Sequence, residues 1–187
     1  MTAPTAPTAE FDVQEFVTSA RYGDLDGVKE VVDAYMSSTH ATSNSATLRT
    51  LYTCALPNGT TALHQASANG HVEILNHLLP HLTVGDVNAV NEDGSSALHW
   101  AALNGKIDCV TLLIECGADA TLQNDQGRSA VTVAEQQGHM DVVNLLLKSF
   151  EPEESGDEDE TAAVRSSVAA VASEVEAEIA EAEKGQK

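Results

Sequence analysis

The sequence predicts an all-α solenoid of four helix-turn-helix repeats joined by short hairpin turns. Three observations support this fold class: a glycine recurs at one position of each repeat, apolar residues recur at fixed offsets after it, and related motifs recur before it. The clearest copies are TALHQASANGHVEILNHLL at 61–79, SALHWAALNGKIDCVTLLIECGADATL at 96–122 and SAVTVAEQQGHMDVVNLLL at 129–147. A chain of 187 residues can hold one such domain together with sequence outside it.

A glycine marks the junction between the two helices of each repeat. The four glycines are Gly23, Gly70, Gly105 and Gly138, at intervals of 47, 35 and 33 residues. An interval of 33 corresponds to one turn with two helices, so the longer intervals contain insertions. We place the larger insertion in SSTHATSNSATLRTLYTCA and the smaller one in PHLTVGDVN. We expect loops there, because loops absorb extra residues at small entropic cost.

The longer helix of each repeat follows this glycine, and Asp24 is a candidate N-cap of the first one. Apolar residues at offsets 2, 5, 8 and 9 from the glycine form one face of a 3.6-residue helix. One repeat cannot bury that face alone, so the repeats must stack on one another. These residues are Leu25, Val28, Val31, Val32, Val72, Leu75, Leu78, Leu79, Ile107, Val110, Leu113, Ile114, Met140, Val143, Leu146 and Leu147.

The shorter helix of each repeat precedes the glycine and is rich in alanine, which suits the narrow space between neighbouring repeats. We therefore expect the short helices to line a concave side. Gly59, Gly94 and Gly127 lie where tight hairpin turns need a residue that tolerates positive φ. The predicted turns are residues 55–61, 88–96 and 121–129.

Changes in composition set the predicted boundaries. A Thr, Pro and Ala-rich segment at 1–10 reads as a disordered leader, and the first repeat, without the TALH motif, reads as an N-terminal cap. After Phe150, EPEESGDEDE has seven carboxylates in ten residues, and such a block repels itself and stays unfolded. We therefore predict a repeat domain at 11–150, with repeats at 11–36, 57–82, 91–119 and 124–150 and an insertion at 37–56, then an acidic disordered tail at 151–187. A valine stripe in that tail predicts a C-terminal amphipathic helix at 161–184.

The charge of the chain favours some classes of binding partner over others. Nine Lys plus Arg stand against 29 Asp plus Glu, a formal net charge of −20. Such a surface repels phosphate and anionic lipid and attracts basic proteins, so direct binding to nucleic acid or membrane is not expected. No apolar run approaches the roughly 18 residues of a spanning helix, and the start does not resemble a secretory signal. Cys54, Cys109 and Cys116 lack CxxC spacing, which predicts reduced thiols and a cytoplasmic or nuclear protein.

The seven histidines could bind metal, act in acid-base catalysis or form structural hydrogen bonds. His64 and His99 occupy the same position of two repeats, and His71 and His139 directly follow repeat glycines, so their register favours a structural role. GDLDG at 23–27 lacks the further acidic ligands of a calcium loop. Because no catalytic constellation or phosphate loop is found, we expect no enzyme activity, cofactor or metal.

A family resemblance rests on TALH with NGH, SALH with NGK, and GADATL, which match the ankyrin-repeat motif over roughly residues 11–150. A narrower resemblance rests on the order of ARYGDLD, a Ser/Thr-rich insertion, SALHWAALNGKID and an acidic tail. In that order the chain is similar to the fungal ankyrin-repeat chaperones dedicated to small-subunit ribosomal protein number three. The resemblance implies that the repeats hold the N-terminal part of this newly made, basic KH-domain protein until it joins the pre-ribosome.

The resemblance also implies a monomer that forms a heterodimer with its client and acts in the cytoplasm and the nucleus. The alternative is a general ankyrin adaptor or scaffold in signalling or regulation, because this fold does not fix one ligand. The fourth repeat departs from the family motif, with Thr132 at the position of the usual histidine. We therefore expect a looser C-terminal cap.

Ankyrin repeats usually grip partners with the hairpin tips and with the two positions before the repeat glycine. Acidic tips would fit a Lys/Arg-rich ligand, although a solvated rim without a role is the alternative. Trp100, the single tryptophan, either packs between two helices or forms a partly exposed anchor for a partner. The candidate partner-binding residues are Arg21, Tyr22, Asn58, Thr60, Ala68, Asn69, Glu92, Asp93, Ser95, Trp100, Leu103, Asn104, Asp125, Gln126, Arg128, Gln136 and Gln137.

Overall fold

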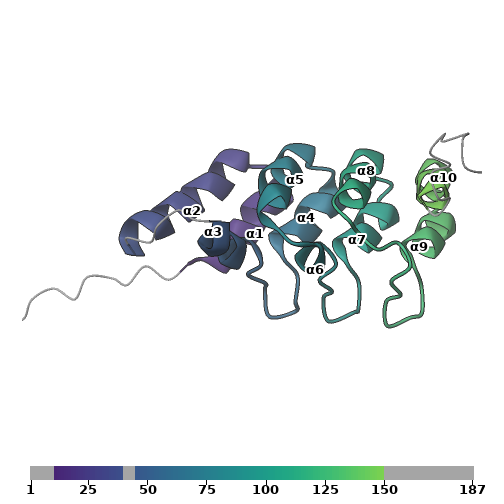
Figure 1. Ribbon diagram of the computed structural model, residues 1–187, viewed down its shortest axis with the longest axis horizontal. Coiled ribbons are helices and arrows are strands. Elements are labelled where there is room, and N and C mark those ends of the chain that lie inside the picture. The colour runs from purple at the N-terminus through teal and green to yellow at the C-terminus, as the bar shows by residue number, and fades with distance from the viewer. Residues whose placement is uncertain (1–10, 40–44, 150–187) are drawn as a thin grey trace, which may run out of the picture. The chain divides into compact units, whose positions relative to one another are not determined.

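The computed structural model describes residues 11–39 and 45–149, and in these ranges it confirms an all-α solenoid. The predicted leader, acidic tail and tail helix lie outside the described residues. In each repeat an inner helix is followed by an outer helix, with the outer helices on one side and three hairpins projecting on the other (Figure 1). The inner helices are α1 (Val13–Tyr22), α4 (Ala62–Asn69), α7 (Ala97–Leu103) and α9 (Ala130–Gln137). The outer helices are α2 (Leu25–Thr39), α5 (Val72–Leu78), α8 (Ile107–Glu115) and α10 (Met140–Lys148).

The four repeat glycines lie at the junction of inner and outer helix, as predicted, and all four adopt positive φ. Gly23 ends α1 with φ 78°, and the side chain of His71 from the next repeat lies directly over it. A Cβ at Gly23 would be 2.6 Å from His71 Nδ1, so the position requires glycine for its conformation and for its close neighbour. Asp24 then accepts the Gly27 backbone N–H at 2.9 Å, which confirms it as the cap of α2.

The three hairpins form where the sequence predicts them. Each is closed by a single antiparallel bridge, and Gly59, Gly94 and Gly127 have φ between 69° and 75°. In the second hairpin, Asn91 Oδ1 accepts the backbone N–H groups of Asp93 and Ser95 at 3.0 and 2.9 Å. These internal hydrogen bonds give each turn a defined conformation. The bridges join Ala55 to Thr61, Val90 to Ser96 and Gln123 to Ser129.

The apolar face of the outer helices is buried mainly at offsets 5 and 8 from the glycine. Val110 and Leu113 of α8, for example, are fully buried. Offset 2 was predicted to be buried but is exposed in the last two repeats, and Met140 is 55% exposed. Offset 4 is a buried position that the pattern analysis missed, because glycine occupies it in the first repeat. It is filled by Ile74, Cys109 and Val142.

The first insertion was predicted to be a loop, and this is wrong for most of its described part. Helix α2 continues to Thr39, and a further helix, α3 (Ser45–Tyr52), follows. Tyr52 is 2% exposed and stacks on Phe16 of α1, with ring centroids 5.9 Å apart and an interplanar angle of 3°. The inserted residues are therefore part of the core, because an aromatic side chain buries a large area on contact with another.

The second insertion is helical as well, in η1 (Leu79–His81) and α6 (Val84–Val87). Asp86 of α6 forms a two-oxygen contact with Arg49 of α3, at 2.6 Å to Nε and 3.0 Å to Nη2. The hydrogen bonds from Arg49 hold the pKa of the Asp86 carboxyl well below its usual range. The two insertions thus fix each other in place.

The three cysteines are free thiols, as predicted. Cys109 is 1% exposed, and burial raises the pKa of its thiol to about 11, so it stays protonated and acts as a small core residue. None of the helices within 11–39 and 45–149 is long and apolar enough to cross a membrane.

Candidate functional site

Two buried histidines, one in α4 and one in α7, each join their inner helix to the next hairpin. His64 Nδ1 accepts the Thr61 backbone N–H at 3.3 Å, and its Nε2–H donates to the Ser95 carbonyl of the following repeat at 3.1 Å. His99 repeats this arrangement, with its Nε2–H donating to the Arg128 carbonyl at 3.1 Å. Burial lowers the pKa of both rings, to about 4 for His64, so both are neutral at pH 7. Their nitrogens are occupied by structural hydrogen bonds, which leaves them no role in chemistry.

The histidines that follow the repeat glycines also bridge repeats. His71 Nε2–H donates to the Arg21 carbonyl at 2.9 Å, and His139 Nε2–H donates to the Leu103 carbonyl at 3.2 Å. Lys106 lies over the glycine of the second repeat in the same way. No group of His, Cys, Asp and Glu in the described ranges is arranged to hold a metal ion.

The hairpin tips are linked to one another by backbone hydrogen bonds. The Glu92 N–H donates to the Asn58 carbonyl at 3.1 Å, and the Asp125 N–H donates to the Asp93 carbonyl at 3.1 Å. The carboxylates of Glu92, Asp93 and Asp125 are exposed along this rim and form no ion pair within the described part of the chain. The predicted acidic rim is therefore a continuous edge of the molecule.

A hollow of about 320 Å³ lies between the third and fourth repeats, enclosed by α7, α9 and the second and third hairpins. We call it the inner hollow. It brings together eight of the candidate partner-binding residues, namely Asp93, Ser95, Trp100, Leu103, Gln126, Arg128, Gln136 and Gln137. It also contains three residues that the sequence analysis did not select, His99, Asn124 and Val133. The hollow combines apolar and hydrogen-bonding groups, which is typical of a site that receives a polar side chain.

Trp100 lines this hollow, and its use as an anchor for a partner stays a prediction. Its ring packs edge to face on His64, with centroids 5.9 Å apart, and is only partly buried. Its indole N–H has no hydrogen-bond partner among the described residues, and neither has the Arg128 guanidinium. An unpaired indole at the edge of a hollow is available to a partner.

The other candidate residues lie outside the inner hollow. Tyr22 is 74% exposed at the end of α1, with the Arg21 guanidinium 5.9 Å from its ring centroid. Asn69 and Asn104 are exposed but donate to carbonyls of their own helices. Thr60 was selected as a hairpin tip contact and this is wrong, because the residue is completely buried and cannot reach a partner. The remaining positions, Asn58, Ala68, Glu92 and Asp125, are exposed or partly exposed.

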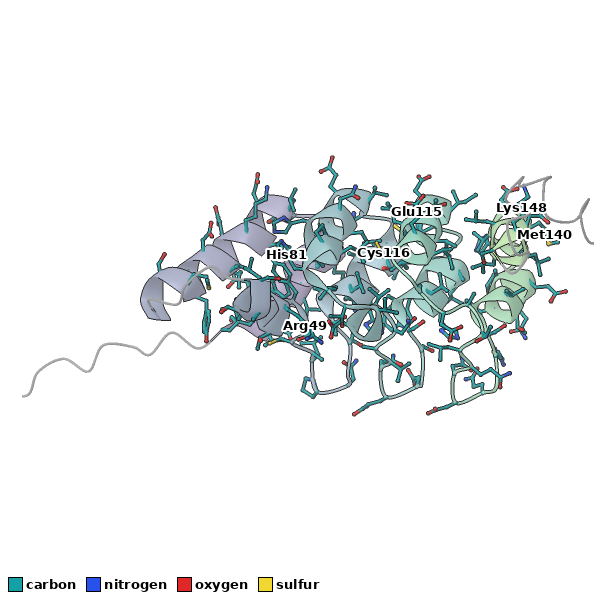
Figure 2. The ribbon with its side chains drawn as sticks, viewed as in Figure 1. Arg49, His81, Glu115, Cys116, Met140 and Lys148 are labelled. Atoms are coloured by element: carbon teal, nitrogen blue, oxygen red, sulfur yellow. The ribbon has the colours of Figure 1, made fainter. Side chains whose placement is uncertain are left out.

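A second hollow, of about 240 Å³, lies between α2, α3, α5 and η1 and was missed by the sequence analysis. Tyr52 Oη lies 3.1 Å from His77 Nε2, and the Tyr52 ring contacts His81 at 5.5 Å between centroids. Figure 2 shows Arg49 toward the hairpins and His81 closer to the outer helices. Burial raises the pKa of Tyr52 and lowers that of His77, so both groups are neutral at pH 7. The aromatic residue in a Ser/Thr-rich insertion was the available signal for this packing.

Comparisons with known proteins agree with this architecture. A family model described as ankyrin repeats (3 copies) matches residues 16–124 and 103–172. Among solved structures 462 chains match, including a chain from the crystal structure of the yeast ribosomal protein Rps3 in complex with its chaperone Yar1. That chain has 35% identity and a TM-score of 0.64, and the match covers 79% of the present chain and 99% of the yeast one. No curated protein matches the sequence.

Proposed function

This chain belongs to the ankyrin-repeat family, a family of non-enzymatic scaffolds for protein binding, and from that premise we propose that it is a dedicated ribosomal-protein chaperone. Its client would be a newly made, basic protein of the small ribosomal subunit. The chaperone would keep this client soluble until assembly into the pre-ribosome. The narrower client that we propose is the protein that corresponds to yeast Rps3, bound through its N-terminal part.

The observation that carries the proposal is the match to a structure in which the yeast chaperone Yar1 holds Rps3. At 35% identity over 99% of the matched chain, the likeness extends over the repeat domain rather than over one motif. The charge of the chain adds independent support, because a protein of net charge −20 attracts basic partners at long range. Ankyrin repeats alone would not favour this client over another, since the fold serves many ligands.

The inner face, formed by the inner helices and hairpins, has the chemistry that such a client needs. The exposed apolar side chains of Tyr22 and Leu103 can contact an amphipathic helix of the client. The acidic rim can steer the basic protein toward this face and cover side chains that would otherwise bind ribosomal RNA. Release would follow when RNA phosphates compete for the same Lys and Arg groups.

The complex that we propose contains one chaperone monomer and one client. We propose that it forms in the cytoplasm, where the client is made, and that the chaperone is present in the nucleus as well. Because the chaperone is acidic, contact between the complex and RNA would pass through the client rather than through the chaperone.

Coexpression tests this function directly. The protein that corresponds to yeast Rps3 is produced with and without the full chain, and its soluble fraction and copurification are measured. We expect a stoichiometric complex, weakened at high salt because charged rim groups contribute to association. A triple variant, Glu92→Lys, Asp93→Lys and Asp125→Lys, should slow association and flatten its salt dependence.

A matched control reverses three carboxylates on outer helices, Glu73→Lys, Glu115→Lys and Asp141→Lys, and leaves the rim intact. Equal effects of the two triple variants would remove the rim from the mechanism. Failure of the client to copurify, with neutral or acidic proteins recovered instead, would favour the adaptor function over the chaperone.

A further inference from the structure

We propose that the inner hollow is a subsite for one arginine side chain of the client, with the guanidinium against Trp100 and paired with Asp93. This inference rests on the proposed function, because it names the part of a basic client that this hollow recognises. The hollow is about 320 Å³ in volume, which is enough space for one long side chain.

Asp93 supplies the charge that a guanidinium needs. Its carboxylate is exposed, forms no ion pair in the described part of the chain, and receives only one long contact, 3.5 Å from Asn91 Nδ2. Both oxygens therefore have lone pairs left for a donor. The carboxylates of Glu92 and Asp125 on the same rim add to the negative potential at the mouth of the hollow.

Trp100 and the amide side chains favour arginine over lysine. A guanidinium is flat and weakly hydrated and stacks on aromatic rings, whereas an ammonium group keeps its hydration. The hollow also contains Gln136 and Gln137, whose amide oxygens can accept the remaining N–H groups of a guanidinium. A site with several acceptors around an aromatic ring matches the five donors of arginine.

Arg128 carries the same charge as the proposed ligand and should weaken its binding. It is exposed, lies in the same hollow, and has no acidic partner among the residues described. A second cation in the hollow therefore meets like-charge repulsion from it. Neutralising Arg128 should strengthen binding, whereas neutralising Asp93 should weaken it, so the two variants have effects of opposite sign.

The single tryptophan gives a direct readout. The indole N–H of Trp100 is the one indole signal in a ¹⁵N-correlation spectrum, because the chain has one Trp. The full chain is titrated with acetyl-Ala-Arg-Ala-amide, and the matched probes contain lysine or citrulline, which has the shape of arginine without its charge. We expect saturable shifts of the indole signal with arginine, about threefold weaker binding with lysine, and at least fivefold weaker binding with citrulline.

Two charge variants and a control complete the test. Asp93→Asn should weaken binding of the arginine probe about threefold to fivefold, and Arg128→Gln should strengthen it about twofold to fivefold. Asp141→Asn, an exposed carboxylate on α10 outside the hollow, should change it by less than about 1.5-fold. Equal binding of arginine and citrulline, or equal effects of Asp93→Asn and Asp141→Asn, would overturn the subsite.

The subsite and the proposed function fail in different experiments. If the client is kept soluble but the arginine probe leaves the Trp100 signal unmoved, the subsite is wrong and the chaperone function stands. If the probe binds with the predicted preferences but no basic ribosomal protein is kept soluble, the hollow recognises arginine in another partner.

Discussion

The first two repeats and the last two share one register but differ in the additional packing that covers them. In the first half, Tyr52 from the inserted helix α3 packs between Phe16 and His77, and Arg49 ties the same helix to α6. The last half has no such addition, and Met140 and Leu147 of α10 are 55% and 50% exposed. The inner hollow lies in this less protected half.

The difference indicates that the stabilising aromatic cluster and the subsite that we propose for recognition lie in different halves of the stack. Aromatic side chains bury large areas, so the cluster around Tyr52 strengthens the first half without using its inner face. Repeats contact mainly their neighbours, and each half can therefore differ in local stability. We expect the half that carries the inner hollow to depend on the first half for a folded neighbour.

The largest effect is expected from removing the aromatic contact in the first half. Tyr52→Ala deletes a side chain that is 2% exposed and stacked on Phe16, so it should lower the free energy of unfolding by about 3–5 kcal/mol. Urea denaturation followed by circular dichroism measures this change. Tyr52→Phe, which loses only the hydrogen bond between the hydroxyl and His77, should cost about 1 kcal/mol.

A matched substitution in the other half completes this test. Leu147→Ala removes an apolar side chain that is 50% exposed, and we expect a loss below about 1 kcal/mol. A larger loss for Leu147→Ala than for Tyr52→Ala would reverse the assignment of the stabilised half.

The next largest effect on stability is expected from acid, through His64, which connects the two halves. Burial lowers the pKa of His64 from its ordinary value near 6.5 to about 4, so between these values the unfolded chain binds a proton that the folded chain does not. The free energy of unfolding should therefore fall as the pH drops from 6.5 toward 4, by up to about 3 kcal/mol for this group.

Urea denaturation across this pH range measures the slope, and His64→Gln provides the control. The variant is expected to be less stable at pH 7 and to show a shallower pH dependence, since the titrating ring is absent. Thr132 holds the equivalent position of the fourth repeat and does not titrate, so this position should add nothing to the slope. An unchanged slope in His64→Gln would assign acid sensitivity to other groups.

The smallest effect is expected from the ion pair that fastens α3. Arg49→Ala removes the contact with Asp86, in which the Arg49 side chain is 48% exposed, and should lower the free energy of unfolding only slightly because solvent screens such pairs. The substitution should nevertheless accelerate hydrogen exchange in α3 and α6 more than in α8, which has no contact with this pair. Uniform exchange in all three helices would show that the ion pair does not fix the insertion.

The regular parts of the fold were predictable from the sequence because their signals are local. A glycine lies at each helix junction and in each hairpin, where the backbone has positive φ. The periodic apolar offsets indicate the outer helices. The position of α3 was not predictable in this way, because Tyr52 and Arg49 are fixed by Phe16, His77 and Asp86, which are distant in sequence.

The candidate site was predictable in part. Positions carried over by register converge in the inner hollow, because neighbouring repeats place equivalent residues side by side. Register alone could not show that Thr60 is buried, since burial depends on how tightly two hairpins pack. It also could not show that Trp100 keeps an unpaired indole N–H, which depends on the neighbours that α7 meets in space.

The hydrogen bonds from His64 and His99 to carbonyls of the next hairpin have a thermodynamic consequence for recognition. The second and third hairpins, which carry the rim carboxylates, are each anchored by a ring that belongs to the preceding repeat, so the spacing of these carboxylates is already set in the free protein. A partner that lands on this edge orders little of the backbone, and most of the interaction energy remains available as affinity. Loss of one of these histidine hydrogen bonds would thus weaken binding, because the hairpin would lose conformational entropy when the partner binds, while the rim carboxylates themselves would be unchanged.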